Sequence, residues 1–222
     1  MNNSFLKKLV FDWHNARKNA ALVKSLFQSE NAFRFKATGN LAPASDVFLH
    51  CYLAIDSGKL KCLLITNKND TQQQHNQQGG LTVVTTTAKL ITSVLPIVTD
   101  SDTIDEKEAK ARVERWTQNR NAFIDRQAAT ASGMQLAFVI PTRALTLGDE
   151  YTAFFALQTD PDTQQDQAAL ILTDNKARVV GGPKEAGFFN TINPVPPFGK
   201  KAELELKNFF LRKLVLEQPV VV

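Results

Sequence analysis

One segment in the middle of the chain, residues 103–129, constrains the fold most because it has the marks of a long amphipathic helix. Its sequence is TIDEKEAKARVERWTQNRNAFIDRQAA. Thr103 and Glu106 match the S/T-x-x-E capping box, in which each side chain binds a free amide of the first turn. Apolar side chains recur at helical spacing at four positions, Ala109, Val113, Trp116 and Phe123. We therefore expect one helix here, with a group of strand-like segments on either side of it.

A second helix is predicted over residues 4–28. Its apolar residues are spaced alternately three and four apart, at Leu6, Leu9, Trp13, Ala16, Ala20, Val23 and Phe27. This spacing is typical of a helix that packs on another helix or on a sheet. A basic amphipathic helix can also lie on a membrane surface. A core-facing helix with a solvated back is the simpler interpretation.

The clearest β-hairpin is predicted over residues 47–65, VFLHCYLAIDSGKLKCLLI. A two-residue turn at Ser57 and Gly58 places Asp56 opposite Lys59. That register gathers one apolar face, made of Val47, Leu49, Cys51, Leu53, Ile55, Leu60, Cys62 and Leu64. A three-residue turn would instead place Lys59 and Lys61 among these residues, so we favour the two-residue turn.

The opposite face of this hairpin carries a candidate interaction surface, formed by Phe48, Tyr52, Leu63 and Ile65. So many apolar side chains need a cover, which a helix or a second chain could supply. The alternative is that the C-terminal segment of the same chain covers them.

Other segments give weaker signals. Residues 66–80 are rich in Gln and Asn and form a long loop, either functional or disordered. Further strands are predicted over 81–87, 134–140, 151–158 and 167–173. Residues 89–98 have no assignable type, 181–200 form a proline-containing arm, and 201–218 fit a helix or a strand, with helix preferred.

The chain also shows a pattern that could be an internal repeat. Trp13 and Arg17 are four residues apart, as are Trp116 and Arg120, and each pair lies on a predicted helix that precedes strands. This predicts a single domain with two similar halves, residues 1–100 and 101–200, followed by a C-terminal segment, 201–222. Chance resemblance between two amphipathic helices is the alternative.

Composition narrows the class of protein. A chain of 222 residues with a net charge of +4 suits one domain that is only mildly basic. Its two cysteines do not make a disulfide framework. No stretch has the length and apolar content of a membrane span, and the N-terminal residues do not resemble a secretory signal. We therefore expect a cytoplasmic protein.

Catalytic motifs are missing from the sequence. It contains no G-x-S-x-G, P-loop, H-E-x-x-H or G-x-G-x-x-G pattern. Cys51 follows His50 directly, but neighbouring strand residues point to opposite faces, so they do not form a nucleophile–base pair. Cys51 and Cys62 are too few for a metal site. We predict no catalytic residues, no cofactor and no metal, although a scattered active site would leave little trace.

Arg112, Trp116 and Arg120 form a candidate nucleic-acid contact, because guanidinium and indole groups can stack on a base. The alternative is structural, with the arginine stems covering the edge of a buried indole.

The sequence as a whole predicts an α+β fold, with antiparallel sheet or sheets and the helices at 4–28 and 103–129 packed on one face. The favoured function is a non-catalytic protein–protein interaction, structural or assembly role, with itself or another protein as partner. The alternatives are a basic-surface nucleic-acid-binding protein and an enzyme with a scattered active site.

Overall fold

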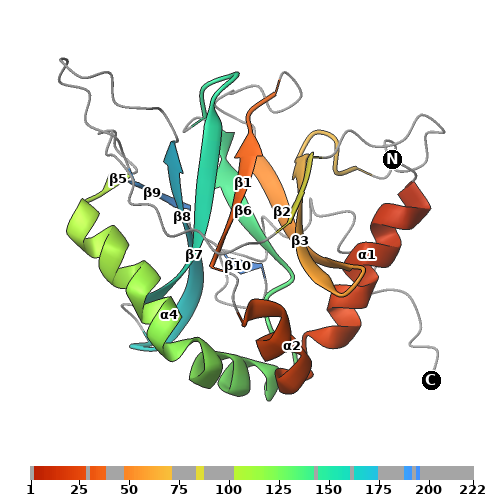
Figure 1. Ribbon diagram of the computed structural model, residues 1–222, viewed down its shortest axis with the longest axis vertical. Helices are drawn as coiled ribbons and strands as arrows, with labels where there is room; N and C mark the ends of the chain where they lie inside the picture. Colours follow the sequence, from red (N-terminus) through yellow and green to blue (C-terminus); the bar gives the residue numbers. More distant parts are fainter. Residues whose placement is uncertain are drawn as a thin grey trace.

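The computed structural model describes residues 3–28, 31–38, 48–71, 84–87, 103–142, 145–160, 163–174, 188–191 and 194–195. Within these ranges the chain forms three helices and two antiparallel five-stranded sheets (Figure 1). The expected α+β class with antiparallel sheets is therefore confirmed. The predictions for residues 89–98 and 201–222, and most of those for 66–80 and 181–200, concern residues outside the described ranges.

The helix expected over residues 4–28 is two helices, α1 (Asn3–Ala16) and α2 (Ala20–Phe27). Asn19 interrupts it, because its backbone is extended (φ −95°, ψ 97°). Its side-chain oxygen accepts a hydrogen bond from the N–H of Leu22 at 3.1 Å. Asn is a favoured N-cap residue, so a new helix starts here. The prediction of one long helix was wrong because the apolar spacing continues across the break.

The central helix, α4 (Glu106–Ala128), begins later than its predicted capping box. Asp105 is the N-cap, and its carboxylate accepts a hydrogen bond from the N–H of Glu108 at 2.9 Å. The prediction that Thr103 caps this helix was wrong. Thr103 belongs to β5 (Thr103–Ile104), where antiparallel pairing with another strand keeps the backbone extended.

Each sheet contains strands from both sides of α4. Sheet A has the order β1 (Ala32–Lys36), β7 (Glu150–Thr159), β8 (Asp166–Asp174), β9 (Phe188–Thr191) and β5. Sheet B has the order β10 (Pro194–Val195), β6 (Ala137–Pro141), β2 (Phe48–Asp56), β3 (Lys59–Thr66) and β4 (Val84–Thr87).

The β2–β3 hairpin has the predicted register. Asp56 pairs with Lys59, and Cys51 with Leu64. Ser57 and Gly58 have positive φ values of 52° and 72°, as a two-residue type I′ turn requires. The register prediction is therefore confirmed.

Helices α1 and α4 lie on the outer sides of the two sheets (Figure 1). Helix α1 lies along β2, and α4 lies along β7 and β8. Under α4, Ala109 and Val113 pack against Phe154, Ala156 and Ile171. The two helices thus cover different sheets, which corrects the expectation that both pack on one face. Each sheet has its own apolar outer face, and one helix covers each.

The main core lies between the sheets. Phe138 of β6 and Phe155 of β7 face each other with ring centroids 6.4 Å apart. Phe155 also contacts Phe27 at 5.1 Å and Trp116 at 5.7 Å. Trp13 and Trp116 are both fully buried. One core therefore joins the helices to both sheets.

The first strand after each helical segment lies in the sheet formed mainly by the other part of the chain. Strand β1 follows α2 but pairs with β7 in sheet A, with Phe35 opposite Tyr151. Strand β6 follows α4 but pairs with β2 in sheet B, with Phe138 opposite Cys51. The edge strands β1 and β4 of the two sheets lie beside each other, and β9 lies beside β6.

Candidate functional site

A buried polar cluster lies on the outer face of sheet B. The Asp70 oxygen Oδ2 lies 2.7 Å from His50 Nδ1 and 2.5 Å from the Tyr52 hydroxyl, which donates to it. The exposed fractions of these residues are 1% for Asp70, 3% for His50 and 0% for Tyr52. The cluster therefore fixes three polar side chains almost out of contact with water.

The turn after β3 brings Asp70 onto β2. His50 and Tyr52 are alternate residues of β2, so their side chains share one face. The carbonyl of Thr66 accepts hydrogen bonds from the N–H groups of Asn69 and Asp70, both at 2.9 Å. This tight turn folds the chain back so that the Asp70 carboxylate reaches both β2 side chains.

The same turn holds the start of β2. The Asn67 N–H donates to the Phe48 carbonyl at 2.9 Å, and the Phe48 N–H donates to Asn67 Oδ1 at 3.3 Å. Both backbone polar groups of Phe48 are therefore bound. Its side chain nevertheless remains 37% exposed.

The chemistry of the cluster favours a structural role. A carboxylate removed from water is costly unless hydrogen-bond donors satisfy it, and His50 and Tyr52 both donate to Asp70. Donation from Nδ1 also fixes the tautomer of a neutral His50. An Asp–His pair can orient a general base, but the His50 side chain is only 4% exposed. A substrate could reach this imidazole only after the covering residues had moved.

Three residues of the predicted interaction surface are covered by the chain itself. Tyr52 is 0% exposed, and Leu63 and Ile65 are 1% exposed. They share one apolar cluster with residues of α1, including Leu6 and Leu9. Helix α1 lies along β2 and so contributes to the cover that these side chains need. Phe48 is the part of this surface that a partner can reach, and binding there stays a prediction.

The residues of the predicted nucleic-acid contact are engaged within the fold. Trp116 is fully buried against Phe27 and Phe155, so a base cannot stack on its indole. Arg120 Nη2 donates to the carbonyl of Gln28 at 3.1 Å. Desolvation by burial lowers the pKa of the Arg120 guanidinium. These contacts agree with the structural interpretation of the three residues.

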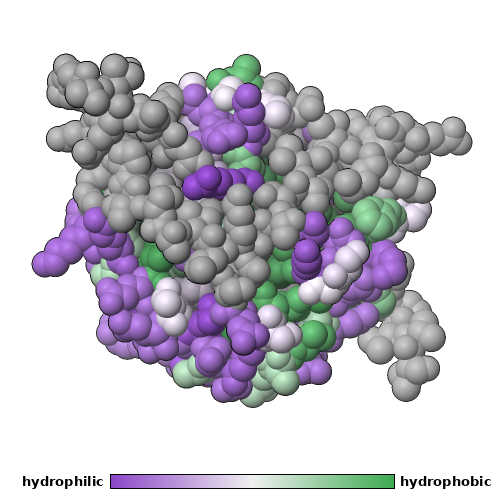
Figure 2. Space-filling view, viewed as in Figure 1, coloured by the Kyte–Doolittle hydropathy of each residue, from purple (hydrophilic) through white to green (hydrophobic). Residues whose placement is uncertain are grey.

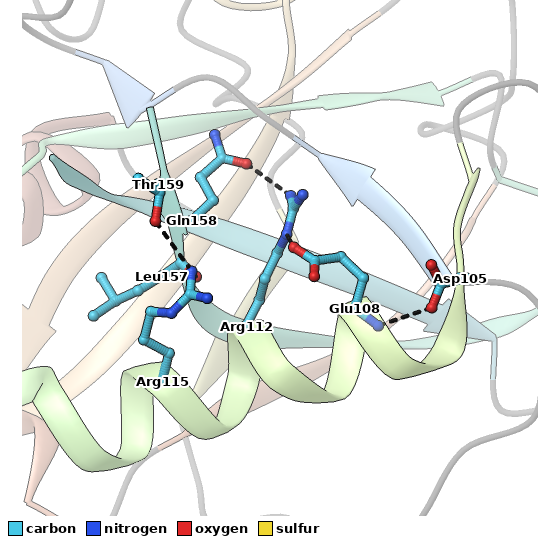
Figure 3. A network of polar contacts seen from close by, with 7 residues as sticks. All are labelled: Asp105, Glu108, Arg112, Arg115, Leu157, Gln158 and Thr159. Atoms are coloured by element: carbon cyan, nitrogen blue, oxygen red, sulfur yellow. Dashed lines mark hydrogen bonds and ion pairs between the residues drawn. The ribbon is translucent and has the colours of Figure 1, made fainter. Parts of the chain in front are cut away.

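Arg112 belongs to a polar network that fastens α4 to the end of β7 (Figure 3). Its Nε donates to Glu108 Oε1 at 2.6 Å, and its Nη1 donates to Gln158 Oε1 at 2.9 Å. One turn further along α4, Arg115 Nη1 lies 3.4 Å from Thr159 Oγ1. Arg112 and Arg115 therefore position α4 on sheet A.

The two cysteines are free and fully buried. Burial, with a smaller contribution from a hydrogen bond to Cys51, raises the pKa of the Cys62 thiol well above its ordinary value. Both thiols lie within the main core. In the described part of the chain, no three His, Cys, Asp or Glu side chains are grouped as metal ligands would be.

The surface of the described residues carries both hydrophilic and hydrophobic side chains. Figure 2 shows hydrophilic residues over most of α4 and hydrophobic residues in separate patches. The large apolar side chains with substantial exposure are Phe5, Leu22, Phe48 and Leu147. None of the helices that the structure describes is long and apolar enough to cross a bilayer.

The Asp70 cluster was not predicted from the sequence. His50 and Tyr52 were placed on one strand face, but Asp70 lies in the polar stretch TNKND, where no spacing links it to that face. The one available signal was an acidic residue four positions after the end of the hairpin strand, which is too common to be informative.

Comparison with known proteins gives no relative for this chain. No family model matches it, and neither the curated proteins nor the solved structures yield a match.

Proposed function

We propose that this chain is a non-catalytic protein–protein interaction or assembly protein, and that it contacts a second copy of itself through Phe48. The observation that supports this proposal is an exposed aromatic ring on a fixed backbone. Phe48 is 37% exposed, while its N–H and its carbonyl are both bound by Asn67. The expected cytoplasmic location is part of the same proposal.

A rigidly held aromatic side chain suits a binding hot spot. Single exposed apolar residues are common on protein surfaces, so exposure alone carries little weight. Phe48 differs because Asn67 clamps its backbone and the Asp70 cluster anchors the same turn. Little conformational entropy is then lost when the ring is covered.

A second copy of the chain is the partner to which we commit. One aromatic ring at the end of a strand suits an isologous contact, in which the same ring from two copies meets across a two-fold axis. Such a contact needs no complementary patch elsewhere on the molecule.

The test is sedimentation velocity over a micromolar concentration series, comparing the wild type with Phe48→Ala and Leu147→Ala. Leu147 is the matched control, because it is 53% exposed but lies in the β6–β7 turn. We expect Phe48→Ala to weaken self-association by about tenfold or more, as hot-spot truncation does, and Leu147→Ala to leave it unchanged. A wild type that stays monomeric throughout, or equal effects of the two variants, would contradict the proposal.

The nucleic-acid alternative retains only the mild positive charge of the chain in its favour, because Trp116 is buried. Oligonucleotide binding that weakens steeply with added salt would revive it.

A further inference from the structure

Each part of the chain contributes one strand to the sheet formed mainly by the other part. These two exchanged strands are β1, which lies in sheet A, and β6, which lies in sheet B. Read outward from the exchanged strand, sheet A runs β1–β7–β8–β9 and sheet B runs β6–β2–β3–β4. In each sheet the exchanged strand pairs with the first strand of a hairpin, and a third strand then pairs with the second hairpin strand. All of these pairings are antiparallel, so these four strands are arranged in the same way in the two sheets. The fifth strands differ, because β5 pairs with β9 and β10 pairs with β6.

The helices make reciprocal contacts as well. In the first part of the chain, Trp13 Nε1 donates to the carbonyl of Gln135 at 3.0 Å, and Arg17 Nη1 donates to the carbonyl of Met134 at 2.7 Å. These carbonyls belong to the connection that follows α4. In the second part, Arg120 Nη2 donates to the carbonyl of Gln28, directly after α2. The arginine of each Trp-x-x-x-Arg pair thus binds a backbone carbonyl in the segment that follows the other helix.

We propose that the chain consists of two units of the same design, residues 3–87 and 103–195, and that each unit is the binding partner of the other. A unit has one helical segment, one strand that lies in the sheet of the other unit, and a three-stranded sheet whose edge pairs with the partner's strand. The partner that fits this surface is a second such unit. It is recognised by its strand edge and by the backbone carbonyls at the end of its helix.

Several contacts hold the units together. The β1–β7 pairing joins five residue pairs, from Ala32–Phe154 to Lys36–Glu150, and β6–β2 joins five more. Helix α2 meets α4 through an ion pair between Lys24 and Asp125 at 2.6 Å. Because the Phe27, Trp116 and Phe155 rings lie in one core, neither unit has a complete apolar core by itself.

This inference goes beyond the contact proposed for Phe48, which lies on the outer surface. It predicts that the units remain paired after the covalent connection between them has been cut. The test uses the full chain with a specific protease site inserted in the segment 88–102. The folded protein is cleaved and then passed over a sizing column in native buffer.

We expect the two fragments to elute together with an unchanged near-ultraviolet circular dichroism spectrum, even after dilution to nanomolar concentration. They should separate only in denaturant and recombine when it is removed. Arg17→Ala should promote separation of the cleaved protein, whereas Lys59→Ala, at the exposed first residue of β3, should not. Fragments that separate at micromolar concentration, or that stay folded after separation, would overturn the inference.

A second measurement needs no inserted site. Leu170→Ala in β8 creates a cavity inside the second unit, since Leu170 is fully buried. If the units fold only together, amide protection should fall equally in β3 and in β8. Loss of protection confined to β8 would overturn the inference. Phe48→Ala should leave the pairing of the cleaved fragments unchanged, so failure of this inference is distinguishable from failure of the proposed self-association.

Discussion

Arg17 and Met134 bind each other by two hydrogen bonds across 117 residues of sequence. The Arg17 guanidinium donates to the carbonyl of Met134 at 2.7 Å, and the N–H of Met134 donates to the carbonyl of Arg17 at 3.0 Å. Gly133 makes this approach possible. A Cβ atom at Gly133 would lie 2.8 Å from the Arg17 carbonyl oxygen, and the glycine has a φ of +68°.

Gly133→Ala should therefore lower the free energy of unfolding by more than Gly58→Ala. Both glycines have positive φ, but a Cβ at Gly58 meets no atom within 4 Å. Gly58→Ala should cost about 1 kcal/mol, from backbone strain alone. Gly133→Ala adds a clash with backbone and should cost about 2–4 kcal/mol. Urea denaturation of the two variants measures the difference, and equal costs would contradict the close approach.

Trp116→Ala should be among the most destabilising single substitutions. The indole is fully buried between Phe27, Phe123 and Phe155, and removing a buried tryptophan costs about 3–5 kcal/mol. Phe5→Ala is the control, because Phe5 is among the exposed apolar residues. Both native tryptophans should also emit at short wavelength and resist quenching by iodide. A solvent-like emission maximum would contradict the core described above.

Asp70→Ala should destabilise the turn that follows β3. It removes the acceptor that His50 Nδ1 and the Tyr52 hydroxyl share, and the loss of a buried hydrogen bond costs about 1–3 kcal/mol. Asp12→Ala is the control, since the exposed Lys8–Asp12 pair should contribute only about 0–1 kcal/mol. Hydrogen exchange at Asn69 and Asp70 should rise in the Asp70 variant. Unchanged exchange there would show that other contacts hold the turn.

His14 should make stability depend on pH. Burial, followed by the charges of Arg17 and Lys18, lowers the pKa of His14 in the folded protein. The unfolded chain, with a pKa of about 6.5, therefore binds the proton first as pH falls. The contribution of neutral His14 to the free energy of unfolding is fully present above the unfolded-state pKa. This contribution is lost as the pH falls from that value toward the folded-state pKa.

The measurement is the free energy of unfolding between about pH 7 and pH 5. His14→Gln should flatten the decline relative to the wild type. Asn15→Ala, at the exposed neighbouring position, should leave the slope unchanged. A decline of the same steepness in the His14 variant would assign the pH dependence to other groups.

Cys51 and Cys62 should react slowly with thiol reagents in the native protein. Both are fully buried, and the raised pKa of Cys62 keeps its thiol protonated. The nucleophile in such reactions is the thiolate, so labelling should require opening of the structure and should accelerate in denaturant. Rapid labelling in native buffer would contradict the burial of both cysteines in the main core.

The features that could be predicted from the sequence are those that depend on residues close together along the chain. The β2–β3 register follows from the Ser57-Gly58 turn and from the alternation of apolar residues, both of which are local. The break at Asn19 was missed because the apolar spacing continues across it. The cap at Asp105 was missed because Thr103 and Glu106 match a capping box two residues earlier. Tertiary pairing of β5 then decided where α4 starts.

The exchange of strands could not be predicted, because alternation of apolar residues shows that a strand has a buried face but not which strand lies beside it. Phe35 meets Tyr151 and Cys51 meets Phe138, and nothing in either pair marks the other. The Asp70 cluster could not be predicted from the sequence for the same reason. Its geometry exists only after a polar turn has folded back on a strand face.

The position of β1 has a consequence for synthesis of the protein. Lys36 of β1 pairs with Glu150, so β1 leaves the ribosome long before its partner strand exists. At the usual elongation rate of about 5–20 residues per second, the wait is roughly 6–23 seconds. During that time Phe33 and Phe35, which are buried in the folded protein, lack their final neighbours. The nascent chain must therefore be kept from aggregating until its second half has emerged.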